Sequence, residues 1–348
     1  MKISIGKLPP NFLEAMVFPR IGIKDHRVLV GPSVGEDAAI VDVGNGSVLV
    51  AHVDPITEAI ERVGWLSVHI ASNDVAVRGV KPEWFLSVIL LPPTSTLDSL
   101  DLITKQIDDA LREVSGTIIG GHTEVSPGLE KPVVIMTAMG IGSRDDIVLT
   151  RGAKPGDYVI VTKAVGLEGT AIIASDFKSK LLGLGVQQST ISEAISYFKE
   201  VSVLKEALAL SKMKSVSSMH DPTEGGLLNG LIEVARASKC IIEVYEKNVP
   251  IREATKVICD TLSLDPLKLI SSGSLIAMVK PNYIDKAMNV LRDLGIDFSV
   301  IGRVISGGGP KVLLHRADGM VEEFSDYVQD EISKLWVNSK GNINVLTL

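Results

Sequence analysis

The stretch Leu66–Pro82, LSVHIASNDVAVRGVKP, decides how this chain is organised. Most of its side chains are apolar, which predicts a buried helix, yet Asn73 and Asp74 stand in the middle of it. A carboxylate in apolar surroundings is costly unless it pairs with a positive charge or binds a cation. Two interpretations of Asp74 are open: an ion pair with Arg78, one helical turn later, or a metal- or phosphate-linked site. Three further acidic motifs in the chain favour the second interpretation.

The composition of the 348 residues is that of a globular protein long enough for two domains. Hydrophobic residues make up 45% and aromatic residues only 4%, which predicts an aliphatic core. The formal net charge of -7 argues against a nucleic-acid surface, although a nucleotide can bind where Mg²⁺ bridges the negative charges. The opening MKISIGKLPP lacks the apolar centre of a signal peptide, and no apolar run approaches the length of a membrane span. We therefore expect a cytoplasmic protein that binds neither nucleic acid nor membranes.

A hairpin is predicted ahead of the opening stretch, between strands at 38–43 and 48–53. The connection Gly44–Ser47 favours a tight turn, because Gly and Asn accept positive φ. Asp37 stands at the entry to the hairpin and Asp54 at its exit, so we expect both carboxylates at the same end of the sheet. Two such carboxylates repel each other unless a cation lies between them; the alternative is that both are solvated turn residues.

A glycine pair marks a further motif. A buried strand at 84–91 and an amphipathic helix at 97–114 precede a strand that runs into Gly120–Val125, GGHTEV. Paired glycines followed by polar side chains are typical of backbone that approaches a ligand, or of a bulge or tight turn. His122 is open to three interpretations: a ligand, an acid–base group or a hydrogen-bonded core histidine.

A domain boundary is predicted where Gly, Pro and charged residues cluster near residues 151–157. It divides the chain into 1–152 and 153–348, and alternating strands and helices predict a mixed α+β sandwich in the second part. Cys240 and Cys259 belong to no Cys/His cluster, so we expect two small buried side chains and no zinc site.

Two loops in the second half have sequences that are typical of ligand-binding sites. Gly166–Thr170 opens a helix whose N-terminal amides are expected to bind an anion. His220–Leu227, HDPTEGGL, opens another helix, which Asp221 or Thr223 would cap. Its paired glycines cost helix stability and indicate the close approach of another chain segment or of a phosphate.

Five motifs, in this order and spacing, resemble those of the aminoimidazole ribonucleotide synthetase (PurM-like) superfamily. That superfamily includes selenophosphate synthetase, thiamine monophosphate kinase and the hydrogenase-maturation group HypE, and HDPTEGGL is most similar to the HypE form. The motifs are GEDAAI (35–40), SNDVAVRGVKP (72–82), GGHTEV (120–125), HDPTEGGL (220–227) and SSGSLIAMV (271–279).

The resemblance implies a fold, a cofactor set and a set of site residues. The fold is α+β, with a PurM-like ATP-binding domain at 1–152 and an α/β sandwich domain at 153–348. The N-terminal mixed sheets of two subunits pair into a β-barrel, so the protein is expected to be a homodimer that binds ATP and Mg²⁺. The implied metal ligands are Asp37, Asp54, Asp74 and Asp221; the catalytic residues are Asp74 and His122; the cofactor-binding residues are Asn73, Gly120, Gly121, Thr123, Thr223, Gly225 and Gly226.

Three features depart from the superfamily pattern. His122 stands where the glycine motif usually has Asp or Glu, although Glu124 is nearby. The Cys or selenocysteine plus Lys pair of selenophosphate synthetase is absent near the N-terminus, where Lys7 is either a phosphate contact or simply solvated. The tail Asn342–Leu348 holds no sulfur, whereas HypE proteins end in a cysteine that receives a carbamoyl group.

These considerations predict a Mg²⁺-dependent, ATP-binding enzyme of the HypE-like group. It would activate an amide or carbamoyl-type oxygen by phosphorylation, followed by dehydration, alongside a protein partner in metallocentre (hydrogenase) maturation. Because of the tail, it would act on a separate substrate and carry no carbamoyl group in the usual way. Two alternatives are open: a phosphotransferase similar to thiamine monophosphate kinase, which HDPTEGGL argues against, and a nucleotide-binding partner protein without turnover, which His122 favours.

Overall fold

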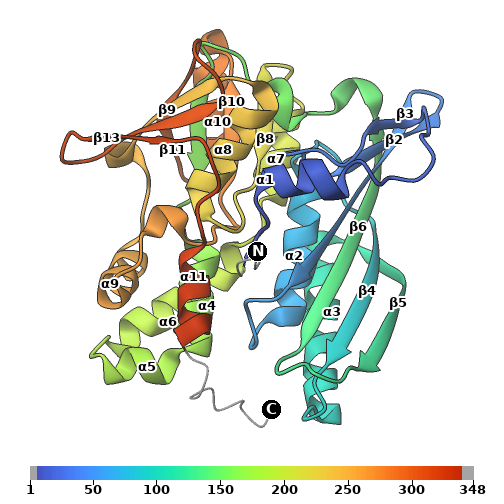
Figure 1. Ribbon diagram of the computed structural model, residues 1–348, viewed down its shortest axis with the longest axis vertical. Helices are drawn as coiled ribbons and strands as arrows, with labels where there is room; N and C mark the ends of the chain where they lie inside the picture. The colour runs from blue at the N-terminus through green and yellow to red at the C-terminus, as the bar shows by residue number, and fades with distance from the viewer. Residues whose placement is uncertain (1–5, 339–348) are drawn as a thin grey trace.

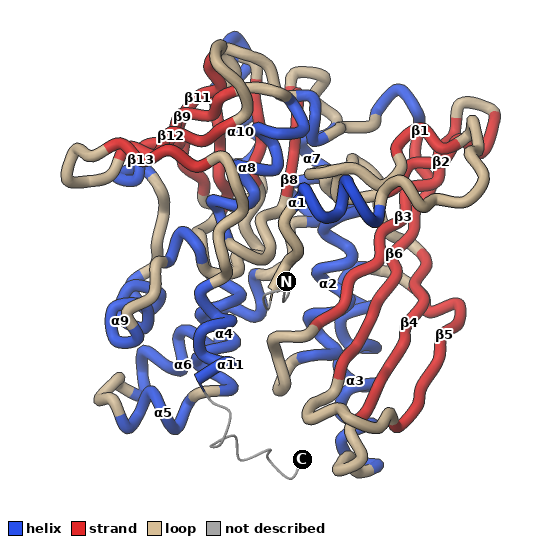
Figure 2. The backbone as a smooth tube through the Cα atoms, viewed as in Figure 1, coloured by secondary structure: helices blue, strands red, loops and turns tan. Residues whose placement is uncertain are grey.

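The computed structural model describes residues 6–338, and the chain folds into two halves that lie side by side, each built on its own sheet (Figure 1). The strands gather into two separate groups, with helices packed around them (Figure 2). Among the described residues, no helix is both long and apolar enough to cross a bilayer. The sulfur-free tail lies outside the described residues.

The N-terminal half is built on a mixed sheet with the strand order β1-β2-β3-β6-β4-β5 among the described residues. Only β4 and β5 run parallel to each other; the other neighbours are antiparallel. The strands are β1 (Val28–Val30), β2 (Ala39–Gly44), β3 (Ser47–Ile56), β4 (Trp84–Leu91), β5 (Thr117–Val125) and β6 (Val133–Ser143).

The predicted hairpin is confirmed, since β2 ends at Gly44 and β3 begins at Ser47. The amphipathic helix is also confirmed as α3 (Leu97–Val114), which Thr96 caps in a reciprocal pair of hydrogen bonds with Ser99. The opening stretch forms α2 (Val63–Ala76), whose side chains are almost all buried. This is the buried helix that its apolar composition predicts.

One face of the N-terminal sheet packs on α2, and the other face is open in the chain as described. Val53 and Leu86 both pair with Thr137, so they share a face, and their side chains are 56% and 37% exposed. The strand Trp84–Leu91 was expected to be wholly buried; instead its alternate residues Phe85 and Ile89 are buried while Trp84 and Leu86 are exposed. The apolar side chains of this strand on the open face would be buried only if another protein surface covered that face.

The C-terminal half is a helix–sheet–helix sandwich. Its mixed sheet has the order β13-β12-β9-β11-β7-β10-β8, with β9 and β12 parallel. Val159 and Val161 of the central strand pack in the core cluster of α8, whereas Ile160 packs in that of α7 and α10, so helices cover both faces. The strands are β7 (Tyr158–Thr162), β8 (Val216–His220), β9 (Ile241–Tyr245), β10 (Ile276–Val279), β11 (Phe298–Ile305), β12 (Lys311–His315) and β13 (Val321–Phe324).

A second group of helices joins the two halves. One continuous hydrophobic core contains side chains of α2 and α3 together with those of α4, α6 and α9. The remaining helices, in chain order, are α1 (Pro10–Phe12), α4 (Leu167–Asp176), α5 (Lys178–Gly183), α6 (Gln188–Ser196), α7 (Leu204–Ser211), α8 (Gly226–Ser238), α9 (Glu253–Leu262), α10 (Ile284–Asp293) and α11 (Glu331–Asn338). The shared core fixes how α2 faces the C-terminal half, which is where the candidate site lies.

Candidate functional site

The four predicted metal ligands come to one junction between the halves. Asp37 precedes β2, Asp54 lies in β3, Asp74 lies in α2, and Asp221 follows β8 directly. Among the described residues, two groups have ligand atoms within 4.8 Å of one another: Asp37, His220 and Asp221 form one, and His52, Asp54 and Asp74 form the other. The two groups act on each other electrostatically. Burial is the largest cause of the raised pKa of Asp74, and the negative charges of Asp221, Asp54 and Asp37 raise that pKa further.

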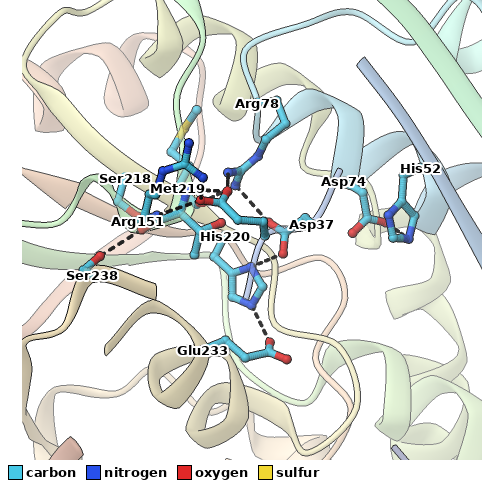
Figure 3. Close-up of polar contacts among 12 residues, drawn as sticks. Asp37, His52, Asp74, Arg78, Arg151, Ser218, Met219, His220, Glu233 and Ser238 are labelled. Atoms are coloured by element: carbon cyan, nitrogen blue, oxygen red, sulfur yellow. Dashed lines mark hydrogen bonds and ion pairs between the residues drawn. The ribbon is translucent and has the colours of Figure 1, made fainter. Parts of the chain in front are cut away.

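Of the two interpretations of Asp74, the ion pair with Arg78 is not found among the described residues. The Arg78 side chain is fully buried and donates to Glu36 at 3.1 Å, to Asp37 at 2.9 Å and to the Met219 carbonyl at 2.5 Å (Figure 3). Helix α2 ends at Ala76, so Arg78 does not lie one turn above Asp74 on the same helical face. Arg78 therefore neutralises the carboxylates that precede β2 and not Asp74.

Asp74 and Asp221 carry carboxylate oxygens that no described residue satisfies. Asp74 Oδ2 lies 3.5 Å from His52 Nε2 without a hydrogen bond, and neither oxygen of Asp221 has a partner. Burial, followed by the charge of Asp37, raises the pKa of Asp221 to about 7. Buried carboxylate oxygens without donors are what a hard divalent cation would satisfy, so Asp54, Asp74 and Asp221 fit a Mg²⁺ site.

Asp37, in contrast, is already neutralised by protein cations. Its Oδ1 lies 2.5 Å from His220 Nδ1 and its Oδ2 accepts from Arg78 (Figure 3). The other ring nitrogen of His220 lies 2.7 Å from Glu233. Although burial lowers the pKa of His220, Asp37 and Glu233 raise it to about 10. His220 is therefore held between two carboxylates, and Asp37 has two ion-pair partners in the chain, while its implied role as a metal ligand stays a prediction.

Lys7 is partly exposed, with 36% of its side chain accessible, and its ammonium is held in an ion pair. Its ammonium lies 2.5 Å from Glu233, which also accepts from the Tyr327 hydroxyl at 2.6 Å. Burial raises the pKa of Glu233, but Lys7 and His220 outweigh it and lower that pKa below the usual range. The N-terminal segment is thereby tied to α8 by a network that also holds Asp37.

A cavity of about 190 Å³ opens beside the acidic junction, between the two halves. Residues of the first half that line it include Asp54 and Glu58, and residues of the second half include Glu168, Thr223 and Glu224. Asp54 thus belongs both to the acidic junction and to the cavity wall. Sequence reasoning placed Asp54 and Thr223 at the site and missed the three glutamates.

Glu168 is the most notable of the residues that were missed. Its side chain is 1% exposed, Oε2 has no hydrogen-bond partner among the described residues, and burial raises its pKa to about 8. At this helix start the Gly166 and Gly169 amides already donate to Ser271 Oγ and the Ile270 carbonyl. With Glu168 also in the first turn of α4, the structure gives no support to the anion site expected there.

Asn73 holds the halves together through its amide. Its Nδ2 donates to the Val201 carbonyl at 2.8 Å, and its Oδ1 accepts from the Val203 amide at 2.9 Å. The side chain is fully buried. Asn73 therefore positions α2 against residues 201–203, and its implied role in cofactor binding stays a prediction.

The glycine motif of the first half lies on β5, at the edge of the sheet. Gly120, Gly121, His122 and Thr123 are three strands away from β3, roughly 14 Å at about 4.8 Å per strand, so one chain does not bring them to Asp54. His122 is 63% exposed and lies 3.1 Å from Glu124. Gly121 is required by packing, since a Cβ there would lie 2.1 Å from the Ser87 carbonyl. The roles implied for these residues stay predictions.

The second glycine pair is explained by the chain's own backbone. Gly225 and Gly226 both have left-handed φ values, 79° and 61°, and a Cβ on Gly226 would lie 2.5 Å from the Leu269 carbonyl. Neither Asp221 nor Thr223 caps α8, which corrects that expectation. The Gly225 amide instead donates to Asp330 at 2.6 Å.

Comparison with known proteins places the chain in a family. Residues 35–142 match the N-terminal domain of AIR synthase related proteins and residues 154–315 match their C-terminal domain. A putative hydrogenase expression/formation protein of Methanocaldococcus jannaschii is 28% identical over 307 residues, covering 85% of this chain and 88% of that protein. Carbamoyl dehydratase HypE of Azotobacter vinelandii is 28% identical over 248 residues, 70% of each chain.

A solved structure of hydrogenase maturation protein HypE in complex with ATP has the same fold, with a TM-score of 0.70 and 24% identity over 95% of this chain and 98% of that one. The agreement covers both sheets and therefore confirms the expected α+β, two-domain, PurM-like fold. The two domain matches identify this protein as a member of the AIR synthase related family.

Proposed function

We propose that this protein is a Mg²⁺-dependent, ATP-using enzyme of the HypE-like group, which phosphorylates an amide or carbamoyl-type oxygen and then dehydrates the acceptor. The observation that carries the proposal is the set of buried carboxylates with unsatisfied oxygens on Asp74 and Asp221, next to Asp54. Negative charge concentrated in this way needs a cation, and Mg²⁺ on a nucleotide supplies one.

The chain itself would contribute in two ways: it would position Mg²⁺ and the nucleotide, and it would exclude water from the site. Asp54, Asp74 and Asp221 would hold Mg²⁺, which when bound supplies positive charge to phosphate oxygens. The apolar side chains of α2 keep water away from Asp74, so that electrostatic interactions there are strong. Asn73 fixes the helix against the other half, and the Arg78–Asp37–His220 network fixes the entry to β2.

The proposed reaction uses ATP to make an oxygen leave. The γ-phosphoryl group would pass to the oxygen of a primary amide, whose nitrogen gives up a proton. That oxygen then departs with the phosphate while the nitrogen loses its second proton, leaving a C≡N bond. The products are ADP, phosphate, the dehydrated acceptor and one net proton. The relatives named carbamoyl dehydratase support this class of reaction.

We also propose a homodimer, with the open face of the N-terminal sheet as the interface. Apolar side chains on that face include Val53, Trp84 and Leu86, and the edge strand β5 is exposed along its whole length. A second subunit packed there would cover both features. It would also explain why the glycine motif and the acidic junction lie apart within one chain.

The test is calorimetry with ATP, with and without Mg²⁺, followed by analysis of nucleotide products in the presence of primary amides and carbamoyl donors. We expect ATP binding that requires Mg²⁺ and release of ADP and phosphate. Absence of ATP binding would overturn the proposal. ATP binding without turnover of any acceptor would favour the alternative of a nucleotide-binding partner protein. The exposed position of His122 is compatible with that alternative.

A further inference from the structure

The cavity beside the acidic junction is lined by acidic side chains that the site described above does not use. Glu58, Glu168 and Glu224 line it, and none of them belongs to the two groups of metal-ligand atoms found among the described residues. Within residues 6–338, none of the three forms an ion pair with a protein cation. The junction therefore extends into a second acidic region that is separate from the proposed Mg²⁺ ligands.

Polar atoms in this region lack partners although they are buried. Glu168 Oε2, Glu58 Oε2 and Ser272 Oγ form no hydrogen bond with the described residues, and Glu168 and Ser272 are 1% and 0% exposed. Two acceptors and a hydroxyl left unsatisfied at a cavity wall are costly unless a ligand supplies donors. This observation is independent of the count of acidic residues, and it points to a hydrogen-bond donor in the cavity.

Lys7 compensates these glutamates only in part, because its ion pair is with Glu233. It is the one cationic side chain among the described residues that line the cavity, and its ammonium is engaged with Glu233, outside the lining. Burial raises the pKa of Glu58, of Glu168 and of Glu224, and it outweighs the opposing effects of Lys131 on Glu58 and of Lys7 on Glu224. A ligand that brought a positive charge would relieve this unfavourable arrangement.

We propose that this cavity is the acceptor pocket and that it recognises a small organic cation, an amine or a guanidine-type group, through Glu58, Glu168 and Glu224. The role as acceptor pocket rests on the proposed function, because Asp54 joins the cavity to the Mg²⁺ ligands. A volume of about 190 Å³ lies below the roughly 300–1,000 Å³ of pockets for drug-sized ligands, so the recognised group is small. A nitrogen with several N–H groups would supply the donors that Glu58 Oε2 and Glu168 Oε2 lack.

The experiment is calorimetry on the full chain with three probes: butylamine, butylguanidine and the neutral butyramide. Each is titrated with Mg²⁺ and a non-hydrolysable ATP analogue present, and again without nucleotide. We expect the two cations to bind at least about tenfold more tightly than butyramide. The Glu168→Gln variant should lose this preference while its affinity for the ATP analogue stays unchanged.

Controls make the outcome specific. Glu253→Gln applies the same substitution to an exposed residue on α9 and should keep the preference. If Glu168→Gln does not fold, Glu224→Gln takes its place with the same expectation. Butyramide that binds as tightly as the cations, or a preference that survives the pocket variants, would overturn the proposal.

Two further outcomes separate this inference from the proposed function. If Mn²⁺ alone fills a site that Glu168→Gln removes and displaces butylamine, the region binds metal and the inference is wrong. If the ATP analogue fails to bind while the cations do, the proposed function fails and the cation pocket stands. If the analogue binds and the cations do not, the cation pocket fails and the proposed function stands.

Discussion

Arg78 donates to Asp37 at 2.9 Å, so the arginine of the helical motif does not pair with Asp74, whose Oδ2 lies 3.5 Å from His52 Nε2. One motif therefore serves two purposes. Its arginine closes the ion-pair network at the entry to β2, and its carboxylate remains unsatisfied at the acidic junction. Each purpose leads to a separate prediction.

The first prediction concerns Asp74. Asp74→Asn should weaken Mg²⁺-dependent ATP binding by about 100-fold, roughly 2.8 kcal/mol, because it removes one charged ligand. The same change should raise the melting temperature of the free protein, since burial raises the pKa of Asp74 well above the usual range and its charged form opposes folding. Calorimetry and thermal unfolding measure the two effects, with the exposed Asp101→Asn as control. Unchanged ATP affinity would remove Asp74 from the site.

The second prediction concerns Arg78. Arg78→Met keeps the length of the side chain but leaves Glu36 and Asp37 with unpaired charge, so we expect a loss of about 3–5 kcal/mol in the free energy of unfolding. Urea denaturation measures it. Arg112→Met removes an exposed pair with Asp108 on α3 and should change little. Similar losses in both variants would show that burial of the Arg78 network contributes nothing.

The third prediction concerns the pH dependence of stability. Burial raises the pKa of Glu168 from 4.5 to about 8, so the folded protein keeps this proton where the unfolded chain loses it. The contribution of Glu168 to stability therefore falls as the pH rises from about 4.5 to about 8. Glu168→Gln should flatten this fall and raise the melting temperature most at alkaline pH. Parallel curves for wild type and variant, recorded without metal, would contradict the assigned pKa direction.

The sequence predicted those parts of the fold that depend on local signals. The hairpin turn at Gly44–Ser47 and the amphipathic helix at 97–114 depend on neighbouring residues, and both were confirmed. The partner of Arg78 could not be predicted, because Asp37 lies 41 positions away and is brought close only by packing. Glu168 was missed for the same reason: nothing in its local sequence shows that it is buried and faces a cavity made by both halves.

The fourth prediction concerns the open face of the N-terminal sheet. Leu86→Glu places a charge on that face and should convert a dimer into a monomer, because an interfacial carboxylate without a partner is costly. Light scattering coupled to size exclusion measures the mass. Met320→Glu, at an exposed apolar residue of the C-terminal half, should leave the mass unchanged. A monomeric wild type at micromolar concentration would remove the proposed interface.

The last prediction concerns the two cysteines. Cys240 and Cys259 are 4% and 1% exposed, and burial raises the pKa of their thiols to about 11 and about 12. Since the thiolate is the nucleophile, neither should accept a carbamoyl group at neutral pH. Peptide mass spectrometry after incubation with carbamoyl phosphate, ATP and a carbamoyl-transferring protein tests this. Alkylation by iodoacetamide provides the control, with both thiols expected to react in urea and neither in the native protein. A carbamoyl or cyano adduct on either residue would mean that the second half opens around it, and would make the protein its own acceptor.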